Sequence, residues 1–347
     1  MTPNAIPQPT RVAVVGVGDF GRNHVRVYRE LPEAVLVGVV DSNAQRACAV
    51  AAEFGTDVIA SFEELAGRVD AVSVAVPTIH HARIGCRLME LGADVLVEKP
   101  LAASLAEADA LLECARRHNR VLQAGHLERF NPGLAAAQQV TTRPLFFEVH
   151  RLGVFTPRSL DIDVVYDVMI HDLDILLALA GAPVADLRAV GIPIVTGKVD
   201  IAHARLEFAT GAVANVTASR VSTERVRKLR FFQEHEYISV DYARRDALRV
   251  RVNSAAGAGK AAMGASYLLG EDTPSPQFAF EKLPVVQEEP LHAELRAFLA
   301  AVRRRSTPLV DGHAGRSALA LADRVMASIL EHAGRVQLGA FTPQAAR

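Results

Sequence analysis

Two groups of residues in this sequence have types and spacings that suit proton transfer. Asp167 and His171 are four residues apart, so on a helix they share a face and can contact each other. A carboxylate that orients an imidazole and supports its cation makes that imidazole a general base. Lys99 stands between Glu98 and Pro100, and its ammonium could stabilise negative charge on a reacting oxygen. The alternatives are an ion pair on a helix surface and a solvated lysine just beyond a strand.

A glycine-rich turn near the N-terminus predicts a dinucleotide site. The pattern GxGxxG is met by Gly16-Val17-Gly18-Asp19-Phe20-Gly21, which follows an apolar run and opens an amphipathic stretch. Gly16 would permit the tight turn, Gly18 the close approach of a pyrophosphate, and Gly21 the packing of helix on strand. The first helical turn would then offer unpaired N–H groups to the phosphate charge.

A carboxylate after the next apolar run predicts which dinucleotide binds. Asp41 comes 20 residues after Gly21, where an acidic residue can accept hydrogen bonds from both hydroxyls of the adenosine ribose. Its charge would repel the 2′-phosphate of NADP, so NAD is the expected cofactor. Arg46 is close enough in sequence to attract that phosphate, and this leaves NADP open as the alternative.

The first third of the chain predicts the scaffold that these residues need. Apolar runs alternate with helical stretches, and Ser104 followed by Glu107 forms a capping-box pattern before the last helix. The runs lie at 11–16, 34–41, 71–76, 94–97 and 121–124, and the helical stretches at 19–31, 44–54, 79–91 and 104–118. This alternation predicts a parallel sheet covered by helices on both faces.

The rest of the chain predicts a second domain of a different kind. A strand at 145–150 and a helix at 164–180 precede five extended segments that have no helices between them. These segments lie at 185–195, 202–208, 213–219, 226–232 and 237–240, and they predict an open antiparallel sheet. A loop at 253–264, a connector at 274–290 and helices at 290–304 and 315–332 complete the chain. We expect a dinucleotide-binding domain at 1–125 and a second domain at 126–347.

Composition excludes several classes of protein. The 347 residues include 38 basic and 39 acidic side chains, so the chain lacks the charge of a general nucleic-acid binder. Three cysteines without a CxxC pair predict neither a metal cluster nor a disulfide framework. Neither a signal-like start nor an apolar run of about 18 residues is present. We therefore expect a cytoplasmic protein without a membrane or nucleic-acid partner.

Three further segments carry a family resemblance. They are Pro77-Thr-Ile-His-His81, Glu98-Lys99-Pro100 and the stretch 167–174 with Asp167 and His171. Together with the glycine turn, they resemble the glucose-fructose oxidoreductase, inositol dehydrogenase and rhizopine-catabolism (Gfo/Idh/MocA) family over nearly the whole chain. The resemblance implies a Rossmann domain followed by an α/β domain with an open, mostly antiparallel sheet. It also implies a homodimer or homotetramer that associates through that sheet.

Residue chemistry and this resemblance together predict the site and its reaction. We expect a secondary hydroxyl of a sugar to be oxidised, with hydride transfer to NAD and no metal. The expected catalytic residues are Lys99, Asp167 and His171. The expected cofactor residues are Gly16, Val17, Gly18, Asp19, Phe20, Gly21, Asp41, Ser42, Pro77, His81, Glu98 and Lys99. The expected substrate residues are Lys99, His126, Arg129, Arg151, Arg158, Asp167 and His171, where for Arg129 an ion pair between domains is the alternative.

A finer resemblance suggests the substrate. Segments 126–132, 158–163 and 167–174 resemble the branch that oxidises the 3-hydroxyl of UDP-N-acetylglucosamine before an amine is installed for lipid A. A dehydrogenase of a free sugar or inositol is one alternative, and a non-catalytic sensor of NAD or sugar is another. The family often has two glycines shortly before the motif aspartate, where this chain has Asp163 and Val164. The family also implies a cis peptide bond before Pro100.

Overall fold

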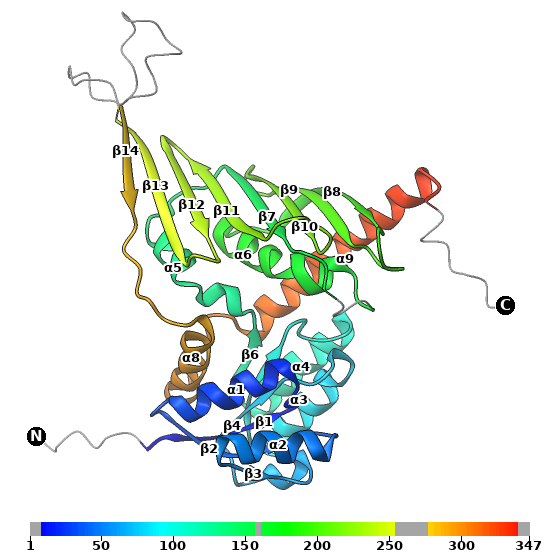
Figure 1. The fold of residues 1–347 in the computed structure, drawn as a ribbon, viewed down its shortest axis with the longest axis vertical. Coiled ribbons are helices and arrows are strands. Elements are labelled where there is room, and N and C mark those ends of the chain that lie inside the picture. The colour runs from blue at the N-terminus through cyan, green and yellow to red at the C-terminus, as the bar shows by residue number, and fades with distance from the viewer. Residues whose placement is uncertain (1–7, 157–160, 254–276, 339–347) are drawn as a thin grey trace, which may run out of the picture. The chain divides into compact units, whose positions relative to one another are not determined.

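The computed structural model describes residues 8–156, 161–253 and 277–338 (Figure 1). The chain forms two compact units, one of Met1–Phe130 with Glu288–Asp323 and one of Asn131–Gln287 with Arg324–Arg347. Residues 288–323 therefore pack with the first unit, although the predicted boundary after residue 125 gave them to the second domain. This return of the chain matters for the site, because it brings a C-terminal helix onto the nucleotide-binding fold.

The first unit contains the predicted parallel sheet. Its six strands have the order β3-β2-β1-β4-β5-β6, and every pair in it is parallel. The strands are β1 Thr10–Val15, β2 Ala34–Val40, β3 Asp57–Val58, β4 Ala71–Val74, β5 Asp94–Glu98 and β6 Leu122–Gly125. The chain reverses its direction of winding between β1 and β4. Ligands of open α/β sheets bind at such a point, beyond the carboxyl ends of the strands.

Helices of the first unit begin where the sequence analysis expected them. The Ser104 hydroxyl accepts the N–H of Glu107 at 3.3 Å, and the Glu107 carboxylate accepts the N–H of Ala103 at 3.1 Å, which confirms the capping signal. The helices are α1 Asp19–Glu30, α2 Ala44–Phe54, α3 His81–Glu90, α4 Leu105–His118 and α8 Pro290–Arg304. Short 3-10 turns lie at Phe62–Leu65, Thr78–His80 and Leu127–Phe130.

Helix α8 completes the core of this unit. Leu295 and Phe298 of α8 are buried in one cluster with Val12 and Val14 of β1 and Tyr28 of α1. Figure 1 shows α1 and α8 side by side within the first unit. A side chain on α8 is therefore in a position to face the residues of α1 and of the sheet.

The second unit contains an eight-stranded open sheet. Its order is β14-β13-β12-β11-β7-β10-β9-β8, and only the β10–β7 pair is parallel. The strands are β7 Phe146–Leu152, β8 Val184–Ile192, β9 Ile201–Phe208, β10 Val213–Ser219, β11 Val226–Gln233, β12 Glu236–Asp241, β13 Asp246–Asn253 and β14 Gln277–Lys282. The open, mostly antiparallel sheet is confirmed. The connector predicted at 274–290 is wrong in part, since it contains β14, and most of the loop predicted at 253–264 lies outside the described residues.

One face of this sheet is covered by helices. Helix α5 (Pro132–Gln139) and helix α6 (Ile170–Ala180) lie on the same side of it in Figure 1. Strands such as β9 alternate strictly, with Ala202, Leu206 and Phe208 buried and the residues between them open. Helix α9 (Gly312–Arg335) closes the described chain. Within the described ranges, no helix is both long and apolar enough to cross a bilayer.

Candidate active site

The glycine turn has the geometry that a pyrophosphate site requires. Gly16 has φ +87°, and a Cβ there would lie 2.6 Å from the carbonyl oxygen of Ala75. A Cβ on Gly21 would lie 1.8 Å from the carbonyl oxygen of Gly16, so these two glycines are needed for the turn itself. A Cβ on Gly18, at the start of α1, would meet no atom within 4 Å. Gly18 therefore leaves open space beside the unpaired amides of the helix.

A cavity of about 650 Å³ lies over this turn. That volume is within the range of about 300–1,000 Å³ usual for small-ligand sites. Its lining includes the predicted cofactor residues Gly16, Gly18, Asp19, Phe20, Asp41, Ser42 and Pro77. The other predicted cofactor residues, Val17, Gly21, His81, Glu98 and Lys99, are not part of this lining. The open glycine, the helix start and the acidic residue together fit the phosphates and the ribose of a dinucleotide.

The carboxylate of Asp41 is fully hydrogen-bonded. It accepts the N–H groups of Val17 and Asn43, both at 2.8 Å, and two N–H groups of Arg46 at 2.9 and 3.1 Å. Burial acts to raise the pKa of Asp41, but the bonds from Arg46, Asn43 and Val17 outweigh it and hold the pKa below its ordinary value. Ribose hydroxyls can reach this carboxylate only by displacing the Arg46 guanidinium, which is itself half exposed.

The backbone around Lys99 is held by a buried histidine. The two ring nitrogens of His81 lie 2.9 Å from the carbonyl oxygens of Val76 and Pro100, beyond the ends of β4 and β5. Burial lowers the pKa of His81, so the imidazole is neutral and one nitrogen donates. The Lys99–Pro100 bond is cis, as the sequence analysis expected. His80 is exposed and is part of the cavity lining.

Glu98 links Lys99 to a residue that the sequence analysis missed. Its carboxylate accepts a hydrogen bond from Nε2 of His24 at 3.0 Å and another from the backbone N–H of Lys99 at 3.2 Å. His24 lies on α1, 74 residues away in sequence, and is completely buried. In the sequence, this role of His24 is signalled only by the presence of a histidine three residues after Gly21, on the inner face of the first helix.

Asp167 and His171 lie at a π turn. Residues Val165–Met169 wind as a π-helix, in which Ile170 donates its N–H to the carbonyl oxygen of Val165, and α6 continues from there. Both side chains are half-buried. The predicted helix is confirmed, but its first turn is wider than the α-helix that the four-residue spacing assumed. Such turns occur often at functional sites. The catalytic pairing of Asp167 with His171 stays a prediction.

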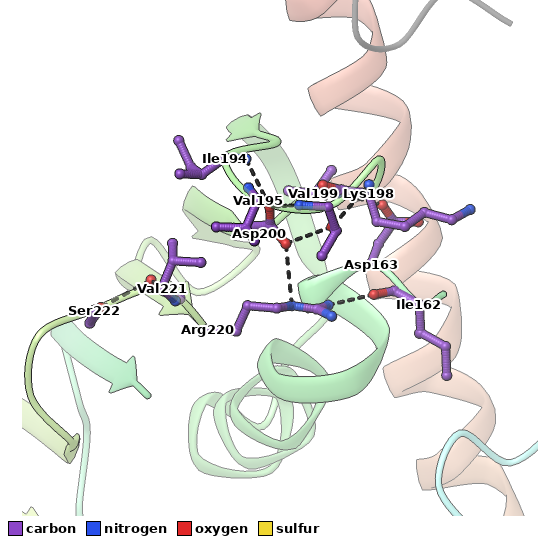
Figure 2. A network of polar contacts seen from close by, with 12 residues as sticks. Ile162, Asp163, Ile194, Val195, Lys198, Val199, Asp200, Arg220, Val221 and Ser222 are labelled. Carbon is purple, nitrogen blue, oxygen red and sulfur yellow. Dashed lines mark hydrogen bonds and ion pairs between the residues drawn. The ribbon is translucent and has the colours of Figure 1, made fainter. Parts of the chain in front are cut away.

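The residues that replace the family glycines anchor this turn (Figure 2). The Asp163 carboxylate accepts the N–H of Val199 at 2.8 Å, and Val164 donates its own N–H to the carbonyl oxygen of Val199 at 2.9 Å. The carbonyl oxygen of Asp163 accepts the N–H groups of Tyr166 and Asp167. The side chain of Asp163 thus ties the start of the π turn to the loop before β9.

The loop before β9 is itself held by a buried ion pair between Asp200 and Arg220. Asp200 accepts the N–H groups of Ile194, Val195 and Thr196 at 2.7–2.8 Å, as part of the network in Figure 2. Burial acts to raise the pKa of Asp200, but these hydrogen bonds hold it below its ordinary value. Arg220 lies 3.8 Å from Asp200 and also donates to the carbonyl oxygen of Ile162. Sequence reasoning missed both residues, because neither belongs to a local motif.

The predicted substrate arginines lie in different settings. Arg151 forms two hydrogen bonds with Asp172, at 2.6 and 2.8 Å, and its guanidinium lies 5.1 Å from the ring centre of Tyr242. This pair is buried, so a diphosphate could bind Arg151 only in exchange for Asp172. Arg129 and His126 are also buried, in and just before a 3-10 turn of the first unit. Arg158 lies outside the described residues.

Comparison with known proteins places the chain in a family. Residues 10–126 match the family described as "Oxidoreductase family, NAD-binding Rossmann fold", and residues 147–238 match the "GFO/IDH/MocA C-terminal domain". A UDP-N-acetylglucosamine 3-dehydrogenase of Acidithiobacillus ferrooxidans is 38% identical over 320 residues, 92% of this chain and 97% of that protein. The chain belongs to the Gfo/Idh/MocA oxidoreductase family. It is therefore a dehydrogenase with an NAD-binding Rossmann domain, as the resemblance implied.

Other proteins similar to this chain are named for different substrates. A scyllo-inositol 2-dehydrogenase (NAD(+)) of Bacillus subtilis is 32% identical over 231 residues, 61% of this chain and 68% of that protein. The solved structure of the Acidithiobacillus dehydrogenase has a TM-score of 0.83 and covers the same 92% and 97% of the two chains. Levoglucosan dehydrogenase, solved with NADH and levoglucosan, has a TM-score of 0.80 at 18% identity over 93% and 98%, which shows the shared fold.

One group of side chains in this Gfo/Idh/MocA protein has ligand atoms close enough to hold a metal ion. This group was found among the residues with described positions. It consists of Glu90, Cys114 and His118, whose ligand atoms lie within 4.8 Å of one another. Burial raises the pKa of the Cys114 thiol, which opposes the thiolate that a metal needs. The group lies on α3 and α4 and is not part of the cavity lining.

Alanine at Gly18 and at Gly21 should separate the two tasks of the glycine turn. Gly18→Ala adds a methyl group where the pyrophosphate approaches, so we expect NAD affinity to fall about 10-fold with little change in melting temperature. Gly21→Ala forces a clash with the Gly16 carbonyl, so we expect a loss of about 3 kcal/mol of stability. Calorimetric titration with NAD and thermal unfolding measure both. Unchanged NAD affinity in Gly18→Ala would contradict the placement of the pyrophosphate.

Proposed function

We propose that this protein oxidises the 3-hydroxyl of UDP-N-acetylglucosamine to the 3-keto sugar and transfers the hydride to NAD. The observation that carries this proposal is the 38% identity to the Acidithiobacillus UDP-N-acetylglucosamine 3-dehydrogenase, which spans nearly the full length of both proteins. The product would be a ketone ready to receive an amine, as the lipid A type of pathway requires. The dinucleotide cavity supports the redox part of the proposal.

Each predicted catalytic residue has a defined task in this proposal. Bound NAD supplies the hydride acceptor. Lys99 donates a hydrogen bond to the hydroxyl oxygen and stabilises the negative charge that develops there. His171 accepts the hydroxyl proton, and Asp167 holds the imidazole in the orientation that this transfer needs. Substrate recognition by His126, Arg129, Arg151 and Arg158 remains part of the same proposal.

A substrate panel tests the proposed specificity. NADH formation is measured with UDP-N-acetylglucosamine, UDP-N-acetylgalactosamine, UDP-glucose, free N-acetylglucosamine, myo-inositol and scyllo-inositol. We expect the highest kcat/KM for UDP-N-acetylglucosamine, by at least about 10-fold over the free sugar, because the free sugar lacks the binding energy of the nucleotide. A clear preference for an inositol would favour the second candidate, which rests on the 32% identity to the Bacillus enzyme. NAD binding without any turnover would favour a sensor.

Variants test the proton-transfer roles. Lys99→Ala and His171→Ala should each lower kcat by about 10²-fold or more while NAD binding persists, because each removes a group that acts on the reacting hydroxyl. Asp167→Asn should lower kcat less, since it disturbs orientation and leaves the base in place. Lys198→Ala is the matched control on an exposed loop. Full turnover in both alanine variants would show that the proposed chemistry is wrong.

We also propose that NAD is preferred over NADP and that Arg46 limits this preference. Arg46 occupies the carboxylate that the ribose needs, and its guanidinium, once displaced from Asp41, could bind a 2′-phosphate. Arg46→Ala should therefore bind NAD at least as tightly as the wild type and bind NADP several-fold more weakly. Titration of both proteins with both cofactors measures this. Tighter binding of NADP than of NAD by the wild type would refute the preference.

A stripe of apolar side chains supports the proposed self-association. Phe146, Phe232, Tyr237, Val250 and Phe280 are cross-strand neighbours on β7, β11, β12, β13 and β14. The ring centres of Phe146 and Phe232 are 5.8 Å apart, and those of Phe232 and Tyr237 are 5.0 Å apart. Phe232 is 37% exposed and Phe280 68%. Because exposed apolar patches of this kind mark association sites, we propose a homodimer or homotetramer through this face.

Light scattering tests that assembly. The wild type at about 10 μM should have at least twice the 37.3 kDa mass of one chain. Replacing two apolar side chains, as Phe232→Ser with Phe280→Ser, should shift the mass toward the monomer because it removes two of the aromatic rings of the stripe. Val286→Ser is the matched control, since Val286 is exposed but lies outside the strands. A monomeric wild type would refute the proposal.

The cysteines are consistent with the cytoplasmic location that we propose. Cys48, Cys86 and Cys114 are all free thiols. Burial raises the pKa of Cys86 to about 12, so this thiol stays protonated and unreactive. Free thiols are usual in reducing compartments.

A further inference from the structure

Three ionisable side chains meet in the core of the first unit, and the proposed chemistry uses none of them directly. His24 comes from α1, Glu98 from the end of β5 and Glu294 from α8. His24 and Glu294 are 0% exposed and Glu98 is 6% exposed. Burying such groups is unfavourable unless hydrogen bonds or proton uptake compensate. Each of the three therefore needs a physical reason to be there.

Glu98 is the hydrogen-bonded member of the group. Nε2 of His24 lies 3.0 Å from one carboxylate oxygen of Glu98, where it can donate a hydrogen bond. The other carboxylate oxygen accepts the backbone N–H of Lys99 at 3.2 Å. Gly125, opposite Glu98 on β6, makes room for this carboxylate, because a Cβ there would lie 2.8 Å from Glu98 Oε1. Glu98 thus joins the imidazole of His24 to the backbone of Lys99.

Glu294 is a buried neighbour of Glu98 that gives it no hydrogen bond. Within the described part of the chain, neither carboxyl oxygen of Glu294 has a hydrogen-bond partner. Burial raises the pKa of Glu294 well above its ordinary value, and the nearby charge of Glu98 raises it further. Glu294 is therefore a neutral acid. Glu98 takes its hydrogen bonds instead from His24 and from the Lys99 backbone.

We propose that His24 is a positioning residue that acts on Lys99 through Glu98, and this rests on the role given to Lys99 in the proposed function. Without the His24 donor, the Glu98 carboxylate would turn toward another partner. That movement weakens its hydrogen bond with the backbone N–H of Lys99, the residue whose side chain acts on the reacting oxygen in the proposed function. A displacement of about 1 Å at such a residue can lower the rate about 10²-fold. We expect substrate affinity to change little, because the displaced group acts on the reacting oxygen.

The cofactor cavity provides a competing explanation that the test must separate. The ring of His24 lies 5.7 Å from that of Phe20, measured between centroids, and Phe20 lines the cavity. A change at His24 could therefore disturb NAD binding through Phe20 instead of Lys99. NAD affinity, kcat and KM must be measured on the same variants.

Two substitutions at position 24 form the central comparison. His24→Gln keeps an N–H donor near the place of Nε2, whereas His24→Leu removes the donor and keeps the bulk. We expect His24→Leu to lower kcat about 10-fold or more, with KM and the Kd for NAD within about threefold of the wild type, and His24→Gln to recover most of the loss. His313→Leu, an exposed histidine on α9, is the matched control.

Three results would overturn the proposal. They are an unchanged kcat in His24→Leu, equal losses in His24→Leu and His24→Gln, and a Kd for NAD that rises in step with the loss of kcat. If His24→Leu fails to fold, Gly125→Ala tests the same link from the other side. Its methyl group displaces the Glu98 carboxylate, so it should lower kcat in the same way, and an unchanged kcat would again overturn the proposal.

Two choices separate this inference from the proposed function. First, kcat is measured with the sugar that the wild type oxidises fastest, so an error in the assigned sugar leaves the comparison intact. Second, one measurement needs no substrate. In parallel, an amine-reactive reagent labels the holoenzyme, and peptide mass spectrometry measures the rate at Lys99 against Lys198 and Lys282. We expect His24→Leu to change the Lys99 rate severalfold and His24→Gln to leave it near the wild type. Equal Lys99 rates in all three proteins would overturn the proposal even if no substrate is turned over.

Discussion

The hydrogen bond between the Lys99 backbone and Glu98 is the interaction on which the candidate site depends. Glu98 accepts the Lys99 N–H, and His81 lies between the carbonyl oxygens of Val76 and Pro100. These contacts join the carboxyl ends of β4 and β5, where an open α/β sheet binds its ligands. A lysine side chain is long and flexible, so it loses conformational entropy when it acts on a substrate. A fixed backbone at Lys99 reduces that loss.

Backbone packing also fixes the positions of the glycine turn and of Asp41 in the cavity. Gly16 and Gly21 allow α1 to approach the sheet, and the N–H of Val17 orients Asp41 at the end of β2. The Asp41–Arg46 pair shows that a binding group can be occupied by the protein itself before the ligand arrives. In the proposed cofactor site, the choice between NAD and NADP would depend on displacement of Arg46 as well as on the charge of Asp41.

The helices and strands that could be predicted are those whose sequence carries hydrophobic periodicity and a signal at its ends. The helix at 44–54, the capped helix after Ser104 and the strand at 213–219 follow from periodicity and end signals. Strands β13 and β14 were missed because charged residues alternate along β13 and the turn signals around β14 resemble a connector. His24 could not be paired with Glu98, since 74 residues separate them and only packing of α1 on the sheet brings them together. The π turn at Val165–Met169 also depends on its tertiary anchor, Asp163 on Val199.

The central claim is that hydride leaves carbon 3 of the amino sugar and reaches NAD, and isotopic transfer measures this step directly. UDP-N-acetylglucosamine that carries deuterium only at carbon 3 is incubated with the protein and NAD, and the NADH formed is analysed by mass spectrometry. The account predicts NADH that carries one deuterium, while sugar deuterated at carbon 4 gives unlabelled NADH. Unlabelled NADH from the carbon-3 substrate, or deuterium transferred from carbon 4, would contradict the account.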